Sequence, residues 1–495
     1  MSATPPNRIL HCMVDPERPA HPAACAPLPV APRTLVSPPL FTAAAMREID
    51  RQWAARHPAA SLMERAGTAA ADLAGTLASE SGAPALVLAG PGNNGGDALV
   101  AARRLTAQGF RVDVVSRADP SRLPPDAARA WAGWRENGGT ILTSIPPLRR
   151  YSLVIDGLFG LGLQRDIGGE DAHWIEQANE MDCPKLALDV PSGLDSDSGR
   201  IRGIALCADH TLTFIGLKPG LFTADGPDYV GQLHLDMLSV DPADLPAAPG
   251  IALTQLESRH RLPARAQNSH KGLFGHVGII GGSHGMVGAC LLTGRAALRQ
   301  GAGSVTLGAL DERVVVDYGE PRLMFAVPEN LVARPPDVLA VGPGLGQGVR
   351  AHALLEAALT APCPLVLDAD ALNLLAGSPD LANRAARRSH PTLLTPHPGE
   401  AAHLLGVSGT DIQTNRIETA LRLSAHYHAH IALKGAGTVI AHPDGRYAIN
   451  TRGGPWLAQA GSGDRLTGMV AALLGQGMAT GDALEAAVWL HGSPA

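Results

Sequence analysis

The sequence predicts an α/β protein with two domains, and three observations lead to this fold class. The chain has 495 residues, which is enough for two or three compact units at about 150 residues each. Short apolar runs alternate with amphipathic segments, a pattern typical of a mainly parallel sheet covered by helices. This alternation occurs twice, before and after a Pro- and Asp-rich stretch at 240–250 that we interpret as a linker.

The first expected domain covers residues 41–245. Residues 1–40 are rich in Pro and Ala without sustained periodicity, so we expect them to be a flexible N-terminal extension. From Phe41 the pattern predicts two helices, the first capped by Thr42 and the second by Ser61. The strands that follow are expected at 85–90, 111–116, 152–160, 185–190 and 209–216.

The second expected domain covers residues 251–495. Its strands are expected at 275–282, 304–310, 337–344, 364–370, 391–400 and 430–441. In both domains Gly, Asp, Asn and His follow the apolar runs, at the carboxyl ends of strands where open α/β sheets bind ligands. The sequence therefore predicts two active sites.

Composition favours small-molecule chemistry. The formal net charge is −6 and no run of Lys and Arg forms the positive stripe that a phosphate backbone requires, which argues against nucleic acid. Six scattered cysteines contain no C-x-x-C pair, so they indicate neither a zinc knuckle nor a disulfide framework, and a reducing cytoplasm fits best. No apolar stretch reaches the roughly 20 residues that span a bilayer. We expect a cytoplasmic protein without a nucleic-acid or membrane partner, and also a homo-oligomer.

Three polar loops follow strands of the first domain. The segment "AGPGNNGGDAL" (89–99) opens a helix, so its N–H groups can hold a phosphate, although a plain tight Gly turn has the same pattern. Asp156, Asp189 and Ser192 stand at the ends of the next two strands. Asn94, Asp156 and Ser192 offer the hard oxygen ligands that alkali and alkaline-earth ions prefer; the alternative is that Asp156 only caps its turn.

The motifs "LMERAG", "GPGNNGGD", "DGLFGLGL" and "LDVPSGLD", in this order, resemble the NAD(P)H-hydrate epimerase family over residues 41 to about 240. The resemblance implies a Rossmann-like three-layer α/β/α domain, K⁺ at Asn94, Asp156 and Ser192, and Asp189 as the acid/base that inverts the C6 hydroxyl of a hydrated nicotinamide ring. It also implies which residues contact the hydrated cofactors NADHX and NADPHX: Asn93, Asn94, Gly95, Gly96, Asp97, Gly160, Leu161, Gly162, Leu163, Gln164, Arg165, Asp166 and Asp189. Ala98 replaces a glycine that is common in relatives, a change that we expect to be tolerated.

The strongest motif of the second domain is "AGSGDRLTG" (460–468), a Gly-rich turn that opens a helix. Its N–H groups can bind an anion, and Asp464 can take the proton from a hydroxyl that attacks a phosphate, as in a phosphotransferase; an Asp N-cap behind a flexible loop is the alternative. "KGAGT" (434–438) supplies Lys434 and backbone donors for a nucleotide. His397 and Glu400 in "TPHPGE" add polar groups, although each alone is more often structural.

Seven ordered motifs resemble the ADP-dependent NAD(P)H-hydrate dehydratase family: "KGLFGHVGIIGGS", "AALRQGAG", "VGPGLG", "VLDADALNLLA", "LTPHPGE", "LKGAGTVI" and "GSGD". The resemblance implies a ribokinase-like fold, with Asp464 catalytic and S-NAD(P)HX converted to NAD(P)H, AMP and phosphate at the expense of ADP. Mg²⁺ is expected to bind mainly through the nucleotide. Residues implied to contact the hydrated cofactor are Ala289, Gly344, Gly346, His397 and Asp464, and those implied for the nucleotide are Lys434, Gly435, Ala436, Gly437, Thr438 and Gly463.

Two other function classes stay open. One is a small-molecule kinase fused to a binding domain, and the other is a first domain that senses the cofactor without catalysis. Three departures concern the second domain: Arg465 stands where relatives usually carry an apolar residue, "RGGPWLAQAG" (452–461) differs from the usual wording, and relatives continue beyond "WLHGSPA" (489–495). Arg465 can assist phosphate binding or pack against its helix.

Overall fold

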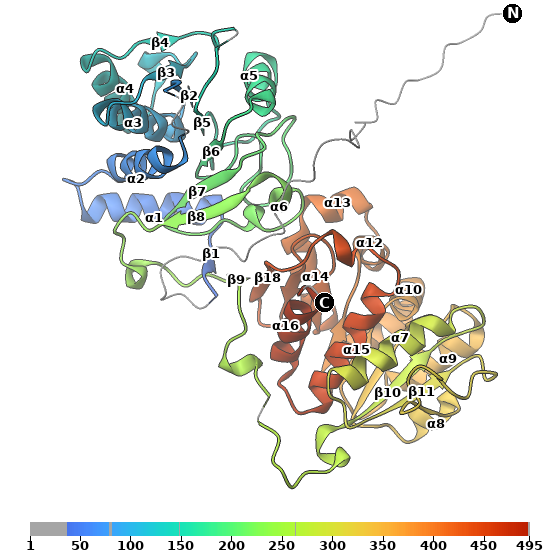
Figure 1. Cartoon of the computed structure of the whole chain (residues 1–495). Helices are drawn as coiled ribbons and strands as arrows, with labels where there is room; N and C mark the ends of the chain where they lie inside the picture. The colour runs from blue at the N-terminus through green and yellow to red at the C-terminus, as the bar shows by residue number, and fades with distance from the viewer. Residues whose placement is uncertain (1–36, 79–81, 148, 263, 494–495) are drawn as a thin grey trace, which may run out of the picture.

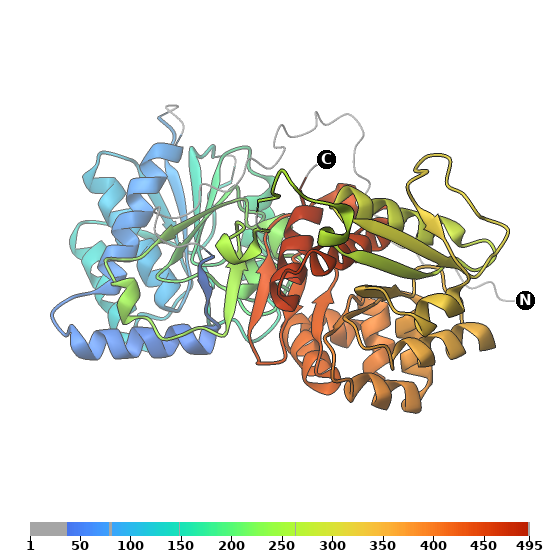
Figure 2. The same cartoon turned by 90° about the horizontal axis from the view of Figure 1, so that it is seen from below.

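The computed structural model describes residues 37–78, 82–147, 149–262 and 264–493. They form two α/β units that lie side by side (Figures 1 and 2). Most of the proposed N-terminal extension, residues 1–36, lies outside the described residues. Within them, no helix is long and apolar enough to cross a membrane.

The first unit contains a seven-stranded parallel sheet in the order β4-β3-β2-β5-β6-β7-β8. The strands are β2 Ala85–Ala89, β3 Val112–Val115, β4 Ile141–Leu142, β5 Leu153–Gly157, β6 Lys185–Leu188, β7 His210–Phe214 and β8 Gln232–Asp236. The helices are α1 Ala43–Arg56, α2 Leu62–Leu77, α3 Asn93–Ala107, α4 Pro125–Glu136, α5 Gly169–Glu180 and α6 Gly226–Tyr229.

Both faces of this sheet are covered. Successive side chains of a strand point to opposite faces, so Val87 packs with α1 to α4 on one face while Leu86 and Leu88 pack with Trp174 of α5 on the other. The expected three-layer α/β/α arrangement is confirmed. The two predicted caps are confirmed as well, because the side chain of Thr42 accepts a hydrogen bond from the third residue of α1 and that of Ser61 does so at α2.

The second unit contains an eleven-stranded sheet in the order β1-β9-β18-β17-β16-β15-β14-β13-β10-β11-β12, of which the last seven strands are parallel. The strands are β1 Pro39–Leu40, β9 Gly250–Leu253, β10 His276–Gly281, β11 Ser304–Ala309, β12 Met324–Phe325, β13 Val338–Val341, β14 Leu365–Leu367, β15 Thr392–Leu394, β16 His430–Leu433, β17 Val439–Ala441 and β18 Tyr447–Asn450. The helices are α7 Val287–Arg299, α8 Pro328–Ala333, α9 Val349–Ala358, α10 Asp370–Gly377, α11 Pro379–Ala386, α12 Pro398–Leu405, α13 Gly409–Thr414, α14 Arg416–Tyr427, α15 Ser462–Gly475 and α16 Thr480–His491.

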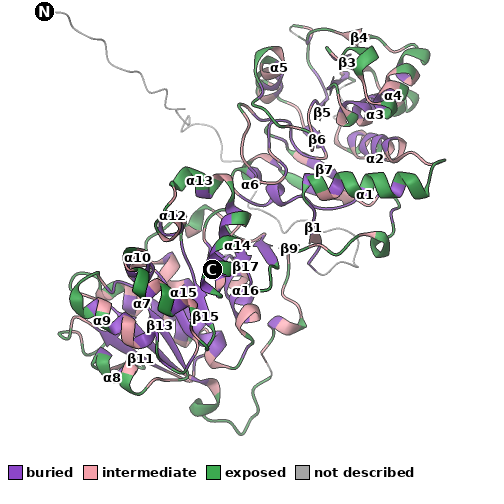
Figure 3. Ribbon diagram, turned by 180° about the vertical axis from the view of Figure 1, so that it is seen from behind, coloured by how far each residue is buried: buried purple, intermediate pink, exposed green. Residues whose placement is uncertain are grey.

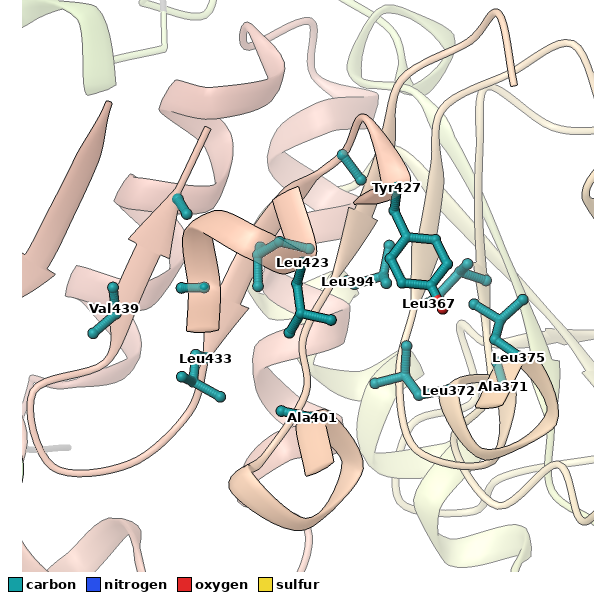
Figure 4. Close-up of a cluster of buried hydrophobic side chains, with 14 of the residues drawn as sticks. Leu367, Ala371, Leu372, Leu375, Leu394, Ala401, Leu423, Tyr427, Leu433 and Val439 are labelled. Atoms are coloured by element: carbon teal, nitrogen blue, oxygen red, sulfur yellow. The ribbon is translucent and has the colours of Figure 1, made fainter. Parts of the chain in front are cut away.

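The core of the second unit lies on both faces of its sheet. On one face, side chains from three neighbouring strands, Leu367, Leu394 and Leu433, pack in one cluster with Leu423 and Tyr427 of helix α14 (Figure 4). Helices α7, α15 and α16 cover the other face. In Figure 3 the buried strands run between helices whose outer faces are exposed. The expected two-domain α/β organisation is confirmed.

Three segments differ from the sequence-based expectation, and one of them is the run 391–400, where strand β15 ends at Leu394 and helix α12 begins at Pro398. Pro39–Leu40, at the end of the proposed extension, forms a strand that pairs with β9, and β9 begins at Gly250, the last residue of the proposed linker. Both strands are too short to show periodicity. Pro has no backbone N–H, but it is tolerated in an edge strand, where an N–H on the outer side has no neighbouring strand to bond. The run 430–441, expected as one strand, is an antiparallel pair, β16 and β17, because the glycines of "KGAGT" turn the chain back.

Two candidate active sites

The first candidate site is a cavity of about 1000 Å³ at the carboxyl ends of the first unit's strands. Helix α1, the start of α3 and the loop after β5 form its walls. Its lining includes most of the residues predicted to bind substrate: Asn93, Asn94, Asp97, Gly160, Leu161, Gly162, Leu163, Gln164, Arg165 and Asp189. Residues of three separate loops therefore meet in one cavity.

Among the described residues predicted to bind substrate, Gly95, Gly96 and Asp166 do not line this cavity. A Cβ on Gly95 would lie 2.0 Å from the carbonyl oxygen of Gly90, and one on Gly96 would lie 2.5 Å from the methyl group of Met63. These two glycines allow α3 to approach the neighbouring strand and helix closely. Their contact with substrate stays a prediction.

Asp189 follows β6 in a left-handed backbone conformation, with φ of 66°. This conformation is uncommon for a residue other than glycine, and such strain is frequent at functional positions. The Oδ1 atom of Asp189 accepts hydrogen bonds from Lys218 Nζ at 2.5 Å and from Thr213 Oγ1 at 3.3 Å. Lys218 is fully buried and donates also to Thr213 Oγ1 and to the carbonyl of Phe214, so all three ammonium protons have acceptors.

Lys218 and Asp50 also line this cavity, and neither was identified from the sequence. Desolvation at the cavity wall raises the pKa of Asp50 to about 6 although the residue keeps an exposed surface; Lys218 lowers this pKa and Asp189 raises it further. Burial, Asp189 and Asp50 together raise the pKa of Asp97 well above its usual range. The cavity thus holds a carboxylate paired with a lysine beside two carboxyl groups that resist ionisation.

The three predicted potassium ligands lie around the backbone of Phe159. Ser192 Oγ donates to Asp156 Oδ1 at 2.6 Å and accepts from the N–H of Phe159 at 2.8 Å, while Asn94 Nδ2 donates to the carbonyl of Phe159 at 3.0 Å. The amide oxygen of Asn94, Oδ1, is buried and has no partner among the described residues. Burial raises the pKa of Asp156 to about 6 although hydrogen bonds from Ser192 lower it. An unpartnered buried oxygen beside a hydroxyl and a carboxylate fits a cation that takes oxygen ligands.

The second candidate site lies where β14, β16 and the start of α15 meet. Lys434 Nζ donates to Asp368 Oδ1 at 2.7 Å and lies 3.8 Å from Glu400 Oε2. Thr467 Oγ1, one turn after Asp464, donates to Asp368 Oδ2 at 2.7 Å. Asp368 lies in the motif "VLDAD" but was assigned no role from the sequence, and Thr467 was not singled out either. Lys434 and Asp464, both predicted from the sequence, thus lie near Asp368, a carboxylate that was not predicted.

The carboxyl groups of this site differ in their proton affinity. Burial would raise the pKa of Asp368, but Lys434 and the hydrogen bonds from Lys434 and Thr467 hold it below its usual range. Burial and the charge of Asp368 raise the pKa of Asp464 to about 6, and Lys434 opposes this. Asp464 is therefore the carboxylate of this pair that can accept a proton near neutral pH.

The remaining predicted substrate residues lie at neighbouring strand ends. His397 caps α12. Its ring Nδ1 accepts hydrogen bonds from the backbone N–H groups of Gly399 and Glu400, and the backbone N–H of His397 donates to Glu400 Oε2 at 2.7 Å. Burial and the charge of Lys434 lower the pKa of His397. Gly344, with φ of 60°, lies against the start of α7, where a Cβ on it would be 3.3 Å from that of Ala289. Gly346 donates its N–H to Asp370.

The predicted nucleotide loop, Lys434 to Thr438, connects β16 to β17. The loop contains two glycines with positive φ, Gly435 at 136° and Gly437 at 59°. Gly463 at the start of α15 faces it, because a Cβ there would lie 3.2 Å from Lys434 Nζ. Arg465, the unusual residue of this helix, has a buried Nε atom without a partner among the described residues.

Comparison with known proteins agrees with this division. Residues 59–220 match the family model described as YjeF-related protein N-terminus, and residues 277–495 match the model described as NAD(P)H-hydrate dehydratase. The bifunctional NAD(P)H-hydrate repair enzyme of Escherichia coli is 40% identical over 83% of this chain and 80% of its own length, and that of Moorella thermoacetica is 36% identical over 92% and 91%.

A solved structure is also similar to part of the chain. It is the ADP/ATP-dependent NAD(P)H-hydrate dehydratase of Bacillus subtilis, co-crystallised with ATP and Mg²⁺, with 36% identity, a TM-score of 0.42, and coverage of 47% of this chain and 84% of that one.

Proposed function

The chain belongs to the bifunctional NAD(P)H-hydrate repair enzymes, and we propose that its first unit interconverts the R and S forms of NAD(P)HX while its second unit dehydrates the S form with ADP. Spontaneous hydration gives both epimers at C6, so a dehydratase that accepts one needs an epimerase for the other. The observation that supports the proposal best is that each unit places a lysine-paired carboxylate beside a carboxyl group with a raised pKa.

In the first unit, we assign the proton donor and the base to different carboxyl groups. Asp97, whose pKa is raised well above its usual range mainly by burial, donates a proton to the C6 hydroxyl, so that the C–O bond breaks and water leaves. Asp189, held by Lys218, takes the proton from the water that adds to the opposite face of C6. Potassium bound by Asn94, Asp156 and Ser192 would supply a fixed positive charge beside the loop after β5.

In the second unit, Asp464 takes the proton of the C6 hydroxyl while the hydroxyl oxygen attacks the β-phosphate of ADP, and AMP leaves. Phosphate is a better leaving group than hydroxide, and its loss together with a proton from C5 restores the C5–C6 double bond. Lys434 and the N–H groups of Gly435 to Thr438 and Gly463 bind the nucleotide phosphates.

Magnesium has no protein cage in this proposal. No group of three or more His, Cys, Asp or Glu that could hold a metal ion occurs among the described residues. Mg²⁺ would be bound chiefly by the phosphates of ADP and would neutralise their charge. A cytoplasmic location and a homo-oligomeric state stay predictions.

The experiment is incubation of the purified protein with a mixture of R- and S-NADHX, with and without ADP and Mg²⁺. Repair predicts that the absorbance of NADH returns for the whole mixture, and only when ADP is present. A stable phosphorylated product would instead indicate a kinase. If Asp189→Ala converts the R epimer at the normal rate, the first unit does not catalyse epimerisation through this residue.

A further inference from the structure

A contact between the two units lies behind the proposed nucleotide loop. Arg416, the first residue of α14, donates from Nε to Thr223 Oγ1 of the first unit at 2.9 Å. A second hydrogen bond, from Arg200 to Thr414, crosses the same boundary at 2.9 Å.

Arg416 is a buried cation, with only 2% of its surface exposed. Its other donors reach Gln413 Oε1 at 2.8 Å and the carbonyls of Leu433 and Lys434, both at 3.2 Å. No carboxylate is among its partners in the described part of the chain. Burial of a guanidinium is costly unless its N–H groups have acceptors. The hydroxyl of Thr223 accepts a hydrogen bond from Nε of Arg416, an N–H group that would lack this partner in the second unit alone.

The same contacts reach the loop itself. The Thr223 hydroxyl lies 3.3 Å from the carbonyls of both Ala436 and Gly437. A Cβ on Gly435 would lie 2.8 Å from Arg416 Nη1, and one on Gly437 would lie 1.8 Å from the carbonyl oxygen of Phe222 in the first unit. The glycines of "KGAGT" are therefore required by the groups behind the loop, independently of any nucleotide.

A peptide unit is planar, so a contact that fixes the orientation of a carbonyl also fixes the orientation of the N–H of the following residue. Contacts to the carbonyls of Lys434, Ala436 and Gly437 thus orient the N–H groups of the next residue in each case. Those next residues are Gly435, Gly437 and Thr438, three of the residues whose N–H groups are proposed to bind the nucleotide. A loop held in its binding conformation loses less entropy when its ligand binds.

We propose that the first unit positions the nucleotide loop of the second, with Thr223 acting through Arg416 as a positioning residue for ADP binding. The inference rests on the proposed function because that function assigns the loop to the nucleotide. Its consequence is that the affinity of the dehydratase for ADP depends on a residue of the epimerase unit.

The test compares Thr223→Val with Thr223→Ser. Valine keeps the shape but removes the hydroxyl, so we expect the KM for ADP to rise about tenfold with little change in kcat, whereas serine should stay within about twofold of the wild type. Thr223 does not line the first cavity, so R-to-S conversion should be unchanged in both variants. Arg416→Lys, which keeps the charge but loses the planar fork, should also raise this KM and provides the measurement if Thr223→Val does not fold.

Thr211→Val is the matched control. Thr211 is equally buried and donates to the carbonyl of Val230 at 2.7 Å within the first unit. It should lose stability without a change in the KM for ADP. The inference is overturned if Thr223→Val matches Thr223→Ser, or if Thr211→Val raises the KM equally. A wild type that neither binds ADP nor dehydrates NADHX would refute the proposed function, and the inference with it.

Discussion

The acid side of the dehydratase pH profile tests the role of Asp464 directly. The proposed base must be ionised to accept a proton, so the rate should fall as the pH falls through its pKa. That pKa is raised to about 6 by burial and by the charge of Asp368. The carboxyl is then about nine-tenths ionised at pH 7 and about one-tenth ionised at pH 5, which predicts a roughly tenfold loss of kcat/KM between these values.

The assay measures initial rates with pure S-NADHX and ADP, so that epimerisation does not contribute. Asp464→Asn should remove most of the activity and abolish the acid limb in whatever rate remains. Asp189→Asn, altered in the other unit, should keep the limb unchanged and serves as the control. The reasoning is refuted if the wild-type kcat/KM is flat from pH 5 to 7, or if the residual activity of Asp464→Asn shows the same limb.

Three further predictions concern the lysines and the potassium ligands. Lys434→Met should lower the free energy of unfolding by about 3 kcal/mol, measured with urea, because Asp368 would be left buried without its cation; adding Asp368→Asn should recover most of the loss. Asn94→Leu should remove any difference in epimerase rate between K⁺ and Na⁺ buffers, because it deletes the unpartnered buried oxygen. Lys218→Met should slow epimerisation about a hundredfold by freeing Asp189, while the rate with S-NADHX and ADP stays normal.

The sequence predicted those parts of both sites that follow strands. Asn94, Asp156, Asp189 and Ser192 stand in glycine-rich motifs at strand ends, and parallel strands bring such ends to one edge of the sheet. Asp50 carries no such signal, because it occurs in a helix whose pattern of polar residues is ordinary for a solvent-exposed surface. Only the packing of α1 over the strand ends shows that this carboxyl faces the cavity.

Lys218 and Asp368 were missed for a different reason. Lys218 follows β7 in a loop without a recognisable motif, and only its complete burial reveals a function. Asp368 shares "VLDAD" with Asp370, and alternation along a strand cannot be followed into the turn beyond it, so the sequence does not decide which carboxylate faces the lysine. The pairing of β1 with β9 joins segments more than 200 residues apart, and no local pattern encodes it.

The two sites use a buried lysine in different ways, and this difference affects which carboxyl groups can donate a proton and which can accept one. In the second unit, Lys434 holds the pKa of Asp368 below its usual range, and burial together with the charge of Asp368 raises the pKa of Asp464 to about 6. In the first unit, Lys218 pairs with Asp189 itself, and the charge of Asp189 helps to raise the pKa of Asp97. Pairs of carboxyl groups driven apart in this way can act as acid and base at one pH. Lys434→Met should therefore shift the acid limb of dehydration toward higher pH, because Lys434 lowers the pKa of Asp464.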